Sequence, residues 1–87
     1  MCRGRGSGFD LVLVASSNGA PDPVAAAQAF VLRGGMPGYG TPSSIWQLTD
    51  PGRPPVREAT VVDGKVSLRA LQFRDGTWAI EQGMRCD

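Results

Sequence analysis

The only two cysteines of the chain, Cys2 and Cys86, stand at opposite ends of its 87 residues. Two thiols that meet in an oxidising compartment form a disulfide, and one that closes so long a loop restricts the unfolded chain by about 4 to 5 kcal/mol in the chain-entropy model. The pattern predicts a Cys2–Cys86 disulfide and an extracytoplasmic protein, secreted or associated with the cell envelope. Two alternatives stay open: both thiols are reduced in the cytosol, or Cys2 is the lipidated first residue of an exported lipoprotein.

Nucleophilic catalysis has little support in the residue types present. Histidine is absent, which removes the usual general base near neutral pH and the commonest metal ligand. A serine nucleophile would need Lys65 as its base. The four candidate serines all lie in turn-rich sequence, where hydroxyls commonly cap the backbone: Ser16, Ser17, Ser43 and Ser44.

Paired carboxylates are the other route to acid–base chemistry. The candidates are Asp10, Glu58, Asp75 and Glu81. No spacing along the sequence places two of them together, and each is explained by a solvated face or a turn. We therefore predict a protein that is not an enzyme and has no metal site and no cofactor. A small hydrolase or transferase with a serine or carboxylate site is the alternative.

Two aromatic residues, Tyr39 and Trp46, lie in the segment 34–48, which consists of a loop rich in Gly, Pro and Ser followed by a short strand. Aromatic side chains offer a large, rigid contact area at low entropic cost. We predict that Tyr39 and Trp46 bind a protein or a cell-envelope component. The alternative for Trp46 is that its ring packs under the loop.

Composition excludes several other classes of partner. The net charge of +1 gives no field that would attract nucleic acid. The longest apolar runs are far shorter than the ~20 residues that cross a bilayer, so no membrane span is expected. Residues 1–8 lack the apolar stretch of an export signal, so the extracytoplasmic interpretation expects Met1 to replace an export segment. The oligomeric state is left open.

Local signals position one helix and five strands. Asp22 can cap a helix whose first residue is Pro23, and Gly34 can end it after Leu32 or Arg33. The apolar run after Phe9 predicts a protected strand over 9–16. Further strands are expected over 45–48, 56–62, 65–73 and 77–82, with a two-residue turn at Asp63–Gly64. The apolar residues of the 65–73 strand fall on both of its faces, so this strand requires either a bulge near Ala70 or burial on both faces.

These elements predict an α+β fold in the order β-α-β-β-β-β, with one helix packed on a four- to five-stranded, mostly antiparallel sheet. Residues 1–8 are expected to be a flexible lead-in and residues 9–87 a single domain. A disulfide requires Cα atoms within about 7 Å of each other, so the termini that it joins must be close. The first and last strands should therefore pair antiparallel.

The order of the signals resembles that of small secreted or lipoprotein-type domains of unknown function from high-GC Gram-positive bacteria. The matching features are the early Cys2, the run Ala15–Gly19, the helix residues Pro23, Ala26, Ala27 and Phe30, then Trp46, and the closing run Asp75–Cys86. The resemblance spans most of the chain. It implies export and a structural cystine, and it supplies no catalytic residues. The third hypothesis for the function is a cytosolic interaction module with reduced cysteines.

Overall fold

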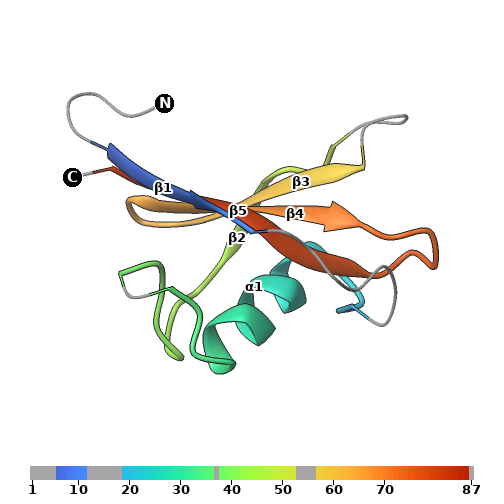
Figure 1. Ribbon diagram of the computed structural model, residues 1–87, viewed down its shortest axis with the longest axis horizontal. Coiled ribbons are helices and arrows are strands. Elements are labelled where there is room, and N and C mark those ends of the chain that lie inside the picture. Colours follow the sequence, from blue (N-terminus) through green and yellow to red (C-terminus); the bar gives the residue numbers. More distant parts are fainter. Residues whose placement is uncertain (1–5, 12–18, 37, 53–56, 87) are drawn as a thin grey trace.

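The computed structural model describes residues 6–11, 19–36, 38–52 and 57–86. The described residues form one helix and five strands, in the order β-α-β-β-β-β (Figure 1). Their bounds are β1 Gly6–Asp10, α1 Pro23–Leu32, β2 Gln47–Asp50, β3 Glu58–Asp63, β4 Val66–Gln72 and β5 Trp78–Cys86. The predicted α+β class is confirmed.

Helix α1 begins and ends where the local signals place it. The Oδ1 atom of Asp22 accepts a hydrogen bond from the Ala25 amide at 2.8 Å, and Pro23 occupies the first turn, where no amide is needed. At the other end the Arg33 amide donates to Ala29, and Gly34 follows with a φ of 98°, a conformation that favours glycine.

The five strands form one antiparallel sheet in the order β1-β5-β4-β3-β2. The first and last strands are neighbours, as predicted, and Gly6 lies opposite Cys86. Cys2 lies outside the described residues. The sheet has two edges, β1 and β2, and β5 lies one position inside the β1 edge.

Several strand boundaries differ from the sequence prediction, and β2 lies two residues later than expected. Strand β1 starts at Gly6, inside the expected lead-in, and among the described residues it pairs with β5 alone. Residues 12–16 of the expected 9–16 strand lie outside the described residues. Strand β5 continues to Cys86 because β1 and β4 pair with its second half. The β3–β4 turn has Gly64 and Lys65 at its centre, one residue later than expected, since Asp63 still pairs with Val66.

Helix α1 covers one face of the sheet, and the core lies between these two layers (Figure 1). Val61 of β3 and Leu68 of β4 pair directly and are fully buried beneath the helix. The other buried members of the cluster are Ala26, Ala27, Tyr39, Trp46, Ala70 and Ile80. We call the opposite side of the sheet the open face, because α1 does not cover it.

The register of β4 against β5 shifts between Arg69, which pairs with Gln82, and Ala70, which pairs with Ile80. One extra residue of β5, Glu81, is inserted at this point. The extra residue belongs to β5, so the side chains of β4 keep their regular alternation, and a bulge within the 65–73 strand is not observed. The bulge in β5 breaks the strict alternation of side chains and allows two successive residues to share a face.

Candidate functional site

Tyr39 and Trp46 do not form the accessible aromatic surface that the sequence suggests. Their side chains are only 7% and 5% exposed, and both belong to the core cluster. For Trp46 the burial agrees with the alternative in which its ring packs under the loop. The reason is that the segment turns back over the sheet edge, and Gly40, with a φ of 110°, lies against the Trp46 ring.

Tyr39 is held from several sides. Its ring meets Phe9 of β1 edge-on, with 4.8 Å between ring centroids, and its hydroxyl lies 2.9 Å from the Ser7 hydroxyl. The guanidinium carbon of Arg85 in β5 lies 5.5 Å from the Tyr39 ring centroid, within the range of a cation–π contact. Tyr39 therefore fixes the 34–48 segment to β1 and β5.

Several exposed side chains around the same segment are apolar. Ile45 is 77% exposed, just before β2, and Leu32 is 72% exposed at the end of α1. Leu32 borders a small hollow with Pro42 and Ser44, which places the helix end beside the 41–46 stretch. Met36, after the helix, and Leu48, in β2, are also exposed. We use the name apolar patch for the exposed apolar side chains of this part of the chain: Leu32, Met36, Ile45 and Leu48.

The serine candidates have structural partners where the structure describes them. The Thr41 amide donates to the Ser44 hydroxyl at 2.9 Å, and the Ser43 hydroxyl lies 3.0 Å from that of Thr41. These bonds stabilise the turn before β2. Ser16 and Ser17 lie outside the described residues.

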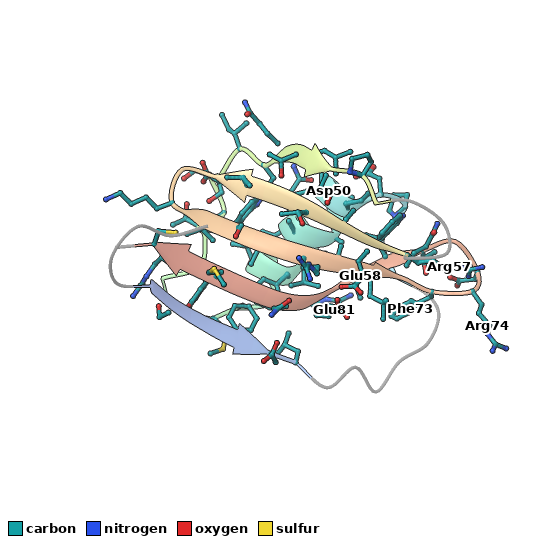
Figure 2. The ribbon with its side chains drawn as sticks, turned by 90° about the horizontal axis from the view of Figure 1, so that it is seen from above. Asp50, Arg57, Glu58, Phe73, Arg74 and Glu81 are labelled. Atoms are coloured by element: carbon teal, nitrogen blue, oxygen red, sulfur yellow. The ribbon has the colours of Figure 1, made fainter. Side chains whose placement is uncertain are left out.

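Two carboxylates that are distant in sequence meet on the open face of the sheet. Glu58 begins β3 and Glu81 is the inserted residue of β5, and Figure 2 shows their side chains turned toward each other across β4. A side-chain hydrogen bond joins the two carboxyl groups. We call Glu58 and Glu81 the carboxyl pair; no sequence spacing indicated it, because β4 separates the two strands.

The surroundings of the carboxyl pair favour one bound proton. Partial burial, the hydrogen bond to Glu58 and the charge of Glu58 raise the pKa of Glu81 to about 7, and Asp10 adds to the increase. Arg69 of β4 opposes it, with Nη1 3.6 Å from Oε2 of Glu58. Two carboxylates that share a site cannot both ionise readily, so the pair holds a proton near neutral pH.

This arrangement can donate or accept a proton. Neither of the hollows that flank α1 is lined by Glu58 or Glu81. Within the described ranges, no group of three or more His, Cys, Asp or Glu side chains could hold a metal ion.

The fold and these features define a small two-layer α+β domain with an exposed apolar patch and a proton-sharing carboxyl pair. No family model, curated protein or solved structure matches the chain. Among the described residues, no helix has the length and apolar character required to span a membrane.

Proposed function

We propose that the chain is a non-enzymatic, exported domain that binds a protein or another cell-envelope component through the 34–48 segment. The apolar patch is the observation that carries this proposal. Four large aliphatic side chains stand 40% to 77% exposed at one end of α1 and around β2. Exposed apolar side chains that lie close together commonly mark interaction surfaces.

The sequence suggested that the two aromatic residues contact the partner, whereas in this proposal they hold the binding segment in place. Tyr39 and Trp46 anchor the segment to the core, and Ile45 and Leu48 are available for contact on either side of Trp46 and Gln47. A binding segment that is already ordered loses less conformational entropy when a partner binds.

Export and the Cys2–Cys86 disulfide belong to the same proposal. Gly6 pairs directly with Cys86, and Cys2 is only four residues before Gly6 in sequence. Four residues span at most about 14 Å, and β-paired Cα atoms lie about 5 Å apart, so Cys2 is within reach of Cys86. Oxidation of this pair is expected in an extracytoplasmic compartment.

Site-specific photo-crosslinking in the exporting cell tests the binding surface. A photoreactive phenylalanine analogue replaces Ile45 in one variant and Met84 in the control. Met84 is also a large exposed apolar residue, at 45%, but lies opposite Ser67 on the open face. A discrete crosslinked product is expected from position 45 alone, and the unlabelled I45S/L48S double variant should fail to compete for it. Identical products from both positions, or none from either, would contradict the proposal.

Acid–base catalysis by the carboxyl pair is a second candidate, favoured by the raised pKa of Glu81. A panel of ester and glycoside substrates distinguishes it from binding alone. Catalysis at this site requires a hydrolytic activity that E81Q loses and D75N, a carboxylate change in the β4–β5 turn, retains.

A further inference from the structure

A second hollow lies on the other side of α1 from the apolar patch, between the helix and the first residues of β5. Its volume is about 410 Å³. That size falls in the range of about 300 to 1,000 Å³ that is typical of small-molecule sites. Most of its lining comes from α1 and β5 and includes Ala26, Ala29, Phe30, Arg33, Trp78 and Ile80. We call this hollow the helix-side groove.

Small side chains create the space and aromatic side chains bound it. Ala26 and Ala29 face the groove from consecutive turns of α1, so no long helix side chain fills it. The Phe30 ring stacks on Phe9 with 5.5 Å between centroids, which fixes one wall. The Trp78 backbone exchanges two hydrogen bonds of 2.8 Å with Ala20, which fixes the opposite wall.

The charge at the groove is positive. Arg33 is the only charged residue among its described lining residues, and the described part of the chain contains no carboxylate in an ion pair with it. Asp22, the acidic residue next to α1, lies at the other end of the helix, where it caps the Ala25 amide. A guanidinium beside a groove that also presents aromatic rings is suited to bind a carboxylate through paired hydrogen bonds.

We propose that the helix-side groove binds an amphipathic carboxylate, a molecule with one acyl chain or aromatic ring and one anionic group. The apolar part lies between Phe30 and Trp78, over Ala29, and the carboxylate contacts Arg33. Contact with the Phe30 and Trp78 rings supplies affinity, since burial of apolar surface drives such binding, and Arg33 selects the anion. This site is separate from the apolar patch and goes beyond the proposed partner-binding function.

Titration with sodium decanoate, followed by amide and indole correlation spectra, tests the proposal. Saturable shifts are expected at the Trp78 indole and at the amides of Ala29 and Arg33. The R33Q variant should bind decanoate about three- to tenfold more weakly, as expected for the loss of one partly exposed charged contact. The control K65Q removes one positive charge at the distant β3–β4 turn and should bind as the unchanged protein does.

Two further measurements separate groove binding from general surface adsorption. The A29L variant places a larger side chain in the groove at a helix position where leucine is well tolerated, and it should abolish the shifts without unfolding the domain. The I45S variant alters the apolar patch and should leave decanoate binding unchanged. Absence of saturable binding, equal loss in R33Q and K65Q, or retained binding in A29L would each overturn the proposal.

Discussion

At the scale of single residues, the carboxyl pair shows how a β-bulge changes the chemistry of a surface. In a regular strand, Glu81 and Gln82 would point to opposite faces of the sheet, and the bulge allows both to share one face. With the bulge, Glu81 comes to lie beside Glu58 of β3, and Arg69 and Asp10 face the pair from β4 and β1. The proton is thus shared between groups from separate strands.

A pH dependence of stability follows from the raised pKa of Glu81. In the unfolded chain its pKa is near the ordinary 4.5, and in the folded protein it is about 7. The folded state therefore binds more protons than the unfolded state between these values, so stability is greatest below about pH 4.5 for this group and falls as the pH rises toward 7. Thermal unfolding should show a lower Tm at pH 8 than at pH 5.

The variant E81Q isolates this effect, because glutamine keeps a hydrogen-bonding head group and does not titrate. Its Tm at pH 8 should exceed that of the unchanged protein, and the fall between pH 5 and pH 8 should be smaller. D75N, in the exposed turn before β5, is the matched control and should keep the full pH dependence. An equally steep fall in E81Q would show that other groups cause it.

At the scale of elements, β5 is the strand that organises the sheet, since it pairs with both β1 and β4. Gly83 lies in β5 opposite Phe9 and Leu68, and it is buried. A methyl group at this position would overlap the Phe9 ring and come within 2.9 Å of the Leu68 side chain. Glycine thus allows the Phe9 ring to lie flat over β5.

The G83A substitution should destabilise the domain by about 1 to 3 kcal/mol, the usual cost of forcing extra volume into a packed core. Urea unfolding measures the change. M84A alters the next residue of the same strand, whose side chain is exposed, and should change the free energy of unfolding by less than about 0.5 kcal/mol. If G83A left the free energy of unfolding unchanged, the Phe9 ring would have moved aside without loss of stability.

Elements whose signals are local were predictable from the sequence, and the site was not. Asp22, Pro23 and Gly34 define α1 because caps act within a few residues of the helix ends. The bulge at Glu81 was not predicted, because the apolar pattern around Ala70 concerns β4 and the extra residue lies in β5. The carboxyl pair depends on the register of three strands, which no local spacing encodes. The burial of Tyr39 and Trp46 likewise depends on how the 34–48 loop folds back onto β1 and α1.

At the scale of the whole molecule, the two ends of the described chain run side by side, with β1 antiparallel to β5 (Figure 1). A Cys2–Cys86 disulfide would therefore close the chain without distorting the sheet. In the chain-entropy model, such a link stabilises the domain by about 4 to 5 kcal/mol. Because β1 is an edge strand with mostly exposed residues, it should be the first element to open when the link is absent.

Protein matured through an export pathway should gain two hydrogen atoms in intact mass upon reduction, and its Tm should fall. Hydrogen exchange of the β1 amides should speed up more than that of the β3 amides. The C2S/C86S variant serves as the control, since a reducing agent should leave its mass and Tm unchanged. An exported wild-type protein whose mass does not change on reduction would refute the disulfide.

The position of β5 in the sheet also governs when the chain can fold. It follows the other four strands of the described residues in sequence, yet it is the strand with which β1, the first of them, pairs. Long-range pairings of this kind give a high contact order and slow folding. The five-stranded sheet therefore cannot be completed until the residues of β5 have been added to the growing chain.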